Sequence, residues 1–234
     1  MPRVVIVIAN PAVSELTGWP IGFWLSELAH PYWEFTKARY DITLASPDGG
    51  AVVHDGMSDP DHERGNARDF VSRGFKTDPS IQELLASTTP ISQISVGDFD
   101  AIFVGGGLSP MYTFAGRADL AELVAAFHSA GKPTALVCHG TCVLLEARTA
   151  VGKLLVEGKT WTGFSNAEED AVDAGAGRVV EPFRIQDRAE ETPGTTFVVG
   201  APFVPHAIAD GHLITGQQGN SGAAAAALLV AALA

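Results

Sequence analysis

The chain contains 234 residues, of which 46% are hydrophobic, and its 15 basic and 27 acidic residues give a net charge of −12 at pH 7. A surface this acidic repels phosphate backbones and anionic lipid, so we expect neither nucleic acid nor a membrane as a partner. The length and the hydrophobic content allow a sizeable core, and we expect one domain over residues 1–234.

Short apolar segments alternate with helical ones along most of the chain. The apolar segments predict buried strands at residues 3–9, 41–46, 100–106 and 133–138. The helical stretches lie at residues 21–39, 79–87, 117–130 and 139–148. This alternation predicts an α/β fold: a doubly wound, mostly parallel, flavodoxin-like sheet sandwiched by helices. After residue 150, short pieces with turn signals predict a further strand, a hairpin-like region and a closing helix.

Residues 46–70 are rich in glycine, aspartate and histidine and form a long segment for a loop. We expect a lid-like insertion around residues 46–75. The segment holds a group of possible metal ligands: His54, Asp55, Asp59, Asp61, His62 and Glu63. Their spacing fits no H-x-x-x-H or H-E-x-x-H template, so we expect solvated side chains and no metal site.

The two ends of the chain carry apolar runs that are short for export or membrane segments. MPRVVIVIAN lacks the longer apolar segment and the cleavage site of a secretory signal. AAAAALLVAALA has twelve residues, whereas a membrane-spanning helix needs about 20. Two cysteines spaced C-x-x-x-C make no disulfide framework. We therefore expect a cytoplasmic protein.

Cys138 stands where a predicted strand turns into a predicted helix, and His139 and Gly140 follow it. Ligands of open α/β sheets bind at the carboxyl ends of strands. Backbone N–H groups there favour negative charge, so we expect a lowered pKa for the thiol and a turn like a nucleophile elbow. The alternative is a small buried hydrophobe. Cys142, one helical turn later, fits a packing role.

Three glycines, Gly105 to Gly107, follow the neighbouring predicted strand. They could serve a turn that needs positive φ. They could also let backbone N–H groups approach a developing oxyanion. Phosphate binding is not predicted, because neither G-x-x-x-x-G-K-[ST] nor a G-x-G-x-x-G that opens a helix is present.

Several motifs occur together in one order: GFWLSELAHPYWEF, LASPDGG, VGGG, LVCHG, GKTWTGFSNAEE and PHAIADGHLITGQQGNS. In this order they resemble the class I glutamine amidotransferase-like superfamily. More narrowly, they resemble the PfpI-peptidase group, in its branch of heat-shock chaperones and glyoxalase III enzymes. The resemblance runs from about residue 3 to the C-terminus.

The resemblance implies catalytic roles for Cys138, His139 and Glu27, the glutamate of the E-L-x-x-P pattern. An acidic residue that orients the histidine maps to Glu169, with Glu168 as the alternative. The H-x-E pair of true glutamine amidotransferases is missing. The branch usually has G-G-H-G after the second strand, whereas this chain reads Gly105-Gly106-Gly107-Leu108. A pocket histidine is thus absent, while oxyanion donors at Gly106 and Gly107 stay possible.

The resemblance further implies a cofactor-independent enzyme, glyoxalase III-like, that converts 2-oxoaldehydes such as methylglyoxal to 2-hydroxy acids such as lactate. The same residues suit a hydrolase of small amides or peptides. A third interpretation is a stress-related holdase, in which exposed apolar surface carries the function. We expect a small-molecule substrate, no metal and, from the resemblance, a homodimer.

Overall fold

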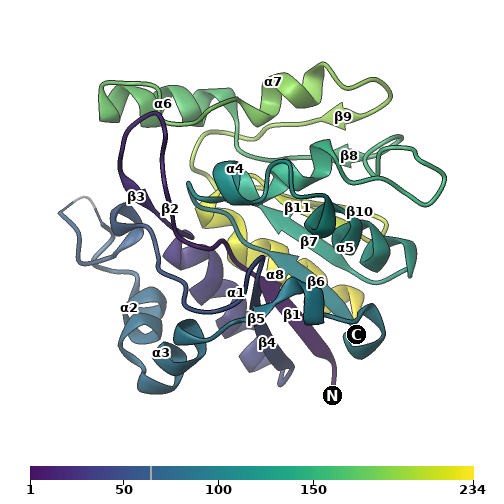
Figure 1. Cartoon of the computed structure of the whole chain (residues 1–234), viewed down its shortest axis with the longest axis horizontal. Coiled ribbons are helices and arrows are strands. Elements are labelled where there is room, and N and C mark those ends of the chain that lie inside the picture. The colour runs from purple at the N-terminus through teal and green to yellow at the C-terminus, as the bar shows by residue number, and fades with distance from the viewer. Residues whose placement is uncertain (64) are drawn as a thin grey trace.

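The computed structural model describes every residue except residue 64, and a seven-stranded sheet forms its centre (Figure 1). All neighbouring strands are parallel except the last two in the chain, which form an antiparallel hairpin. In spatial order the strands are β10 (Ala207–Asp210), β11 (Leu213–Gly216), β7 (Thr134–Val137), β6 (Ala101–Val104), β1 (Arg3–Val7), β4 (Asp41–Ser46) and β5 (Thr89–Pro90).

The central strands are buried on both faces, which is why they are apolar at nearly every position. In β1, Val4 and Ile6 pack into one core cluster, while Val5 and Val7 pack into the other. All four side chains are fully buried. Successive side chains of a strand point to opposite faces, so a strand between two helical layers needs no polar alternation.

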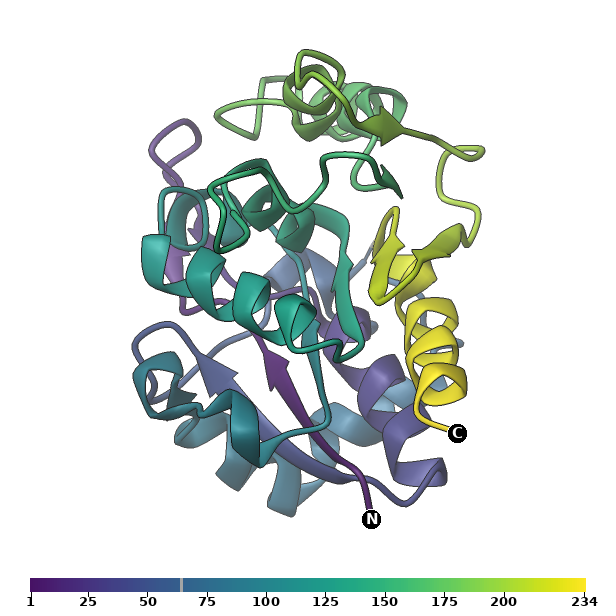
Figure 2. The same cartoon turned by 90° about the vertical axis from the view of Figure 1, so that its right-hand side faces the viewer.

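Helices cover both faces of the sheet (Figures 1 and 2). The layer with Val4 and Ile6 contains the first and last helices, which pack side by side. The layer with Val5 and Val7 contains α5 and the segment after β7. The helices are α1 (Leu25–Lys37), α2 (Phe70–Thr77), α3 (Pro79–Ala86), α4 (Pro110–Thr113), α5 (Ala118–Ser129), α6 (Asn166–Ala176), α7 (Ile185–Glu190) and α8 (Gly222–Ala232).

Smaller elements complete the fold. Two short strand pairs are β2 (Ala12–Val13) with β3 (Pro20–Ile21), and β8 (Thr160–Trp161) with β9 (Thr196–Phe197). The 3₁₀ helices are η1 (Gly56–Ser58), η2 (Ile91–Gln93), η3 (Val96–Asp98), η4 (Cys138–Leu145) and η5 (Gly219–Ser221). In Figure 2, α6 and α7 lie at the opposite end of the molecule from the two termini.

The structure confirms the predicted doubly wound, mostly parallel sheet and its four apolar strands, but it corrects several helices. The expected helix 21–39 begins only at Leu25. The expected helix 139–148 is instead the 3₁₀ helix η4. The helices α6 and α7 fall where only short pieces were expected. Among the described residues, no helix is long and apolar enough to cross a membrane.

The segment expected to be a lid contains η1 and most of α2, and residue 64 within it lies outside the described part of the chain. Asp59 and Asp61 both form ion pairs with Lys76. Asp55, expected to be solvated, is instead buried and accepts a hydrogen bond from the Met57 N–H. Within the described ranges, 1–63 and 65–234, no three His, Cys, Asp or Glu residues are grouped to hold a metal ion. The lid role stays a prediction.

Candidate active site

Cys138 lies directly after β7 in a strained backbone conformation. Its φ is 56°, in the left-handed region that few residues other than glycine adopt. Such a conformation costs on the order of 1–3 kcal/mol and persists only where the surroundings fix it. Here the Thr141 hydroxyl donates to the Cys138 carbonyl at 2.6 Å. A Cβ at Gly140 would lie 2.6 Å from the Gly105 carbonyl oxygen, so only glycine fits the turn. The predicted elbow geometry is confirmed.

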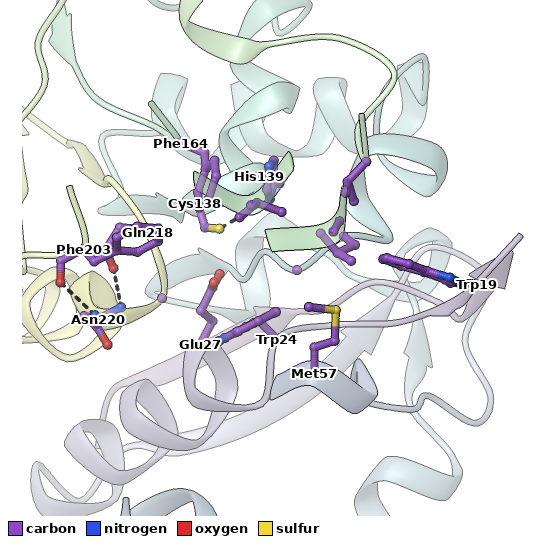
Figure 3. Close-up of a pocket in the computed structure, with 16 residues that line it drawn as sticks. Trp19, Trp24, Glu27, Met57, Cys138, His139, Phe164, Phe203, Gln218 and Asn220 are labelled. Carbon is purple, nitrogen blue, oxygen red and sulfur yellow. Dashed lines mark hydrogen bonds between the residues drawn. The ribbon is translucent and has the colours of Figure 1, made fainter. Parts of the chain in front are cut away.

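Glu27, in the first turn of α1, points toward the thiol (Figure 3). Its side chain is buried, its carboxyl points toward the Cys138 thiol, and the two groups affect each other's pKa. Two backbone contacts of Gly106 hold Glu27 and the start of α1 in place. The Gly106 N–H donates to Glu27 Oε2 at 2.7 Å, and the Trp24 N–H donates to the Gly106 carbonyl at 3.1 Å. A Cβ at Gly106 would come within 2.6 Å of Glu27 Oε2 and 2.8 Å of the Cys138 Cβ.

Burial decides the proton affinities of this pair. It raises the pKa of Glu27 to about 7, although the contacts with Cys138, His139 and Gly106 oppose the rise. Burial also raises the pKa of the Cys138 thiol, and the nearby Glu27 charge adds to the rise. The predicted fall of the thiol pKa is therefore wrong. Backbone N–H groups do lower it, but less than the loss of water and the carboxylate raise it.

His139 is a buried member of an ion pair. Its Nδ1 lies 3.5 Å from the Cys138 Sγ, and its Nε2 lies 3.0 Å from Glu169 Oε1. The imidazole stacks on Phe164 with the ring centroids 4.2 Å apart. Burial alone would lower the pKa of His139, but the Glu169 carboxylate, together with the charges of Glu181 and Glu27, outweighs burial and raises the pKa to about 9. We therefore expect a protonated imidazole at neutral pH, able to donate to sulfur.

The two candidate acidic residues on α6 have different surroundings. Glu169 contacts His139, as its mapping implied. Glu168 instead caps its own helix: Oε2 accepts from the N–H and the hydroxyl of Ser165. Its other oxygen accepts from the Phe203 N–H at 2.8 Å. The geometry thus assigns the histidine contact to Glu169 and a structural position to Glu168.

The two glycines also differ. The N–H of Gly106 is occupied by Glu27, so the expectation of an oxyanion donor at Gly106 does not fit this arrangement. The N–H groups of Gly107 and His139 face the Cys138 thiol and lower its pKa. Gly107 has φ +118°, and a Cβ there would lie 2.5 Å from the Trp24 nitrogen. The usual histidine of G-G-H-G would therefore have no room in this backbone.

A cavity opens above these groups (Figure 3). Its wall includes residues for which the motif analysis assigned no role: Trp19, Trp24, Met57, Leu108, Phe164, Val172, Ala176, Val180, Phe203, Gln218 and Asn220. Some of them stand in the quoted motifs, such as TGF for Phe164 and GQQGNS for Gln218 and Asn220. Trp19 and Val180 come from segments that carried no functional signal.

Glu181 is a buried carboxyl that sequence analysis also missed. Its side chain is 5% exposed, and neither carboxyl oxygen has a hydrogen-bond partner among the described residues. Burial raises its pKa to about 8; the charge of His139 lowers it, while Glu169 raises it further. Glu181 in turn contributes to the raised pKa of His139. It is a third acidic group in the surroundings of the imidazole, after Glu169 and Glu27.

A mostly parallel sheet with a strained cysteine at a strand end, an adjacent histidine and buried carboxyls defines a protein of the class I glutamine amidotransferase-like type. Within that class, the chain belongs to the DJ-1/PfpI family, whose family model matches residues 21–232.

Several relatives are similar over almost the whole chain. Glyoxalase 3 of Candida albicans is 25% identical over 221 residues, which cover 92% of this chain and 91% of that protein. The glutathione-independent glyoxalase HSP31 of Saccharomyces cerevisiae is 24% identical and covers 85% of this chain and 84% of its own. The X-ray structure of Rapid Encystment Protein 24 kDa of Francisella tularensis has a TM-score of 0.89 at 26% identity and covers 100% of both chains.

Proposed function

We propose that the protein is a glutathione-independent glyoxalase that converts methylglyoxal to lactate with Cys138 as the nucleophile. One observation carries the proposal: the thiol is paired with a buried Glu27 whose pKa is about 7. A carboxyl with this pKa can accept and return a proton near neutral pH, as the isomerisation requires. The relatives named as glyoxalases, from Candida albicans and Saccharomyces cerevisiae, support the proposal.

The first step forms a hemithioacetal. The Glu27 carboxylate takes the thiol proton, and the Cys138 sulfur attacks the aldehyde carbon. The proton on Glu27 passes to the aldehyde oxygen. The N–H groups of Gly107 and His139, together with the protonated imidazole, stabilise the anionic sulfur and then the anionic oxygen. Gly106 takes no part except to hold Glu27.

The second step moves a hydrogen between the two carbons of the substrate. Glu27, again a carboxylate, takes the proton bonded to the first carbon, and the resulting enediol accepts it at the second carbon. The first carbon is oxidised to a thioester and the second is reduced to an alcohol, so no external oxidant is needed. Water hydrolyses the thioester to lactate. His139 is charged at neutral pH, so it acts as an acid and not as a base: it donates a proton to the leaving sulfur.

Hydrolysis of a small amide is a second candidate, favoured by the buried His139–Glu169 contact beside the thiol. A protonated imidazole is a suitable acid for a leaving amine. We further propose a homodimer, on the family resemblance, and a cytoplasmic location. Light scattering of the purified protein would test the dimer, and chromogenic amides would test the hydrolase.

The test of the main proposal is lactate formation from methylglyoxal without glutathione, after exhaustive chelation. Cys138→Ala should abolish turnover. Glu27→Gln keeps the shape but carries no proton, so kcat should fall by at least about a hundredfold. Glu34→Gln, on the same helix, is the control and should match wild type. Unchanged turnover in Glu27→Gln, or no lactate from wild type, would contradict the proposal.

The pH dependence gives a second check. The free enzyme needs Glu27 ionised and His139 protonated, and these groups have pKa values of about 7 and about 9. Because kcat/KM reports the free enzyme, it should rise through pH ~7 and fall through pH ~9. A rate that is independent of pH from 6 to 10 would remove both groups from the mechanism.

A further inference from the structure

The cavity above Cys138 is larger and more apolar than methylglyoxal requires. Its volume is about 160 Å³. Apolar cavities of about 150 Å³ in other proteins stay dry and bind benzene. Apolar side chains dominate the wall, among them Trp19, Trp24, Met57, Leu108, Phe164 and Val180. Methylglyoxal offers only one methyl group to such a wall.

The polar and apolar parts of this cavity are separated in space. The reactive groups of Cys138 and Glu27 lie at its middle, with Gln218, Asn220 and Phe203 on one side and Trp19 on the other (Figure 3). The polar side has local partners for its amides: Gln218 Nε2 donates to the Val204 carbonyl, and Asn220 Nδ2 donates to the Phe203 carbonyl. These amide groups hold their own loop together.

The side towards Trp19 is built from three distant segments. Leu108 and Val180 form a small apolar cluster with Ile21, and Trp19 and Ala176 pack against it. All of these except Ile21 also line the cavity. Leu108 follows Gly107 in the stretch that departs from the usual G-G-H-G, so a leucine contributes to this wall near the thiol. Nothing in this set offers a charge to a small hydrated aldehyde.

We propose that the preferred substrates are 2-oxoaldehydes with an aromatic or similarly bulky apolar substituent, bound with the substituent towards Trp19 and Leu108. The proposal rests on the proposed glyoxalase function and adds the substrate side chain. Phenylglyoxal represents the class. Its aldehyde carbon accepts the Cys138 sulfur, its aldehydic hydrogen moves as a proton to the ketone carbon through Glu27, and water releases mandelate. Atoms and electrons balance within substrate and water.

The first measurement compares kcat/KM for phenylglyoxal and methylglyoxal. One additional methylene in a fitted apolar pocket changes kcat/KM about 10- to 200-fold, so a ring should give an advantage of at least about tenfold. The second measurement does not depend on glyoxalase activity. It compares the alkylation of Cys138 by N-phenyl iodoacetamide and by iodoacetamide, each divided by its rate with free glutathione. The normalised rate of the phenyl reagent should again be about tenfold higher.

A matched pair of variants on α6 locates the effect. Ala176 lines the cavity, whereas Ala174 on the same helix is exposed. Ala176→Phe should fill the apolar side and remove most of the phenyl advantage in both measurements. Ala174→Phe should leave both ratios as in wild type. An unchanged ratio in Ala176→Phe would overturn the proposed position of the substituent.

The two proposals can fail separately. If methylglyoxal is converted as efficiently as phenylglyoxal and the phenyl reagent has no lead, the preference for bulky substrates is refuted and the glyoxalase function stands. If neither aldehyde is converted, the function and the substrate class fall together. If the phenyl reagent still alkylates Cys138 faster in that case, the cavity is an apolar binding site that serves another reaction of Cys138.

Discussion

Glu181→Gln tests whether a buried carboxyl that has no hydrogen-bond partner among the described residues makes stability depend on pH. The group has a pKa of about 8 in the folded protein and 4.5 as its ordinary value. The folded state therefore holds this proton more tightly than the unfolded state does. By linkage, stability is highest below the unfolded pKa and is lost as pH rises from about 4.5 to about 8. At pH values at which the Glu181 carboxyl is ionised in the folded protein, it destabilises the fold.

The size of the loss follows from the same values. At about 1.4 kcal/mol per tenfold change in proton affinity, the rise from 4.5 to about 8 corresponds to about 5 kcal/mol as an upper bound. Glu181 also borders an open cavity beside Glu169 and Arg184, where water can relieve part of this cost. We expect about 2–5 kcal/mol. Glutamine does not ionise, and its unpaired amide lowers the stability of the variant by about 1–3 kcal/mol at every pH. This constant cost shifts the difference in unfolding free energy between variant and wild type, but it does not change how that difference depends on pH.

Urea unfolding followed by tryptophan fluorescence gives the free energy of unfolding at each pH from 5 to 8.5. The difference between Glu181→Gln and wild type should move in favour of the variant by about 2–4 kcal/mol across this range, because part of the loss lies below pH 5. Glu191→Gln replaces an exposed residue in the same region and should show a constant difference. A flat difference for Glu181→Gln, or one that moves in favour of wild type as pH rises, would refute the reasoning.

Three further predictions concern the site. Limiting iodoacetamide should label Cys138 well ahead of Cys142, because Cys138 lines the cavity whereas Cys142 packs in the core and is not part of the cavity wall. Peptide mapping that finds equal labelling would count against the elbow as the reactive position. Gly106→Ala should lower oxoaldehyde turnover at least about a hundredfold, because the new methyl group would push the carboxyl and the thiol apart; wild-type kinetics would show that their contact is dispensable. Glu169→Gln should lower the pKa of His139, which NMR titration measures. Glu168→Gln should leave the pKa of His139 unchanged and lower the free energy of unfolding by about 1–3 kcal/mol. The reverse pattern would exchange the roles of the two glutamates.

The sheet could be predicted because strands covered on both faces are apolar at almost every position, and such runs are visible in a single sequence. The helix α6 was missed because it has no buried apolar face: its buried residues are Glu168 and Glu169. A signal was nevertheless present: Ser165 and Glu168 have the spacing of a capping box, and the structure contains both of its hydrogen bonds. The 3₁₀ helix after β7 could not be foreseen, because Leu144 and its neighbours have a composition that suits an α-helix equally well.

The site could be predicted only in part. The position of Cys138 followed from the strand that precedes it, but the direction of its pKa depended on a carboxyl delivered by a distant helix and on complete burial. Glu181 had no motif of its own. Its relation to His139 arises only when the segment after α6 folds back beside Glu169. Tertiary packing, which local sequence does not encode, decides these properties.

The buried acidic groups around His139 cost stability, but their raised pKa values suit proton transfer near neutral pH. With the imidazole charged and paired with Glu169, one negative charge is already balanced. Glu27 and Glu181, with pKa values of about 7 and 8, are then close to the point where each can gain or lose a proton at neutral pH. Of these two carboxyls, Glu27 is the one that faces the thiol, so in the proposed mechanism its proton serves the reaction. Glu181 adjusts the charge behind the histidine, and the strained φ of Cys138 adds a second local cost that the fully buried strands around it must offset.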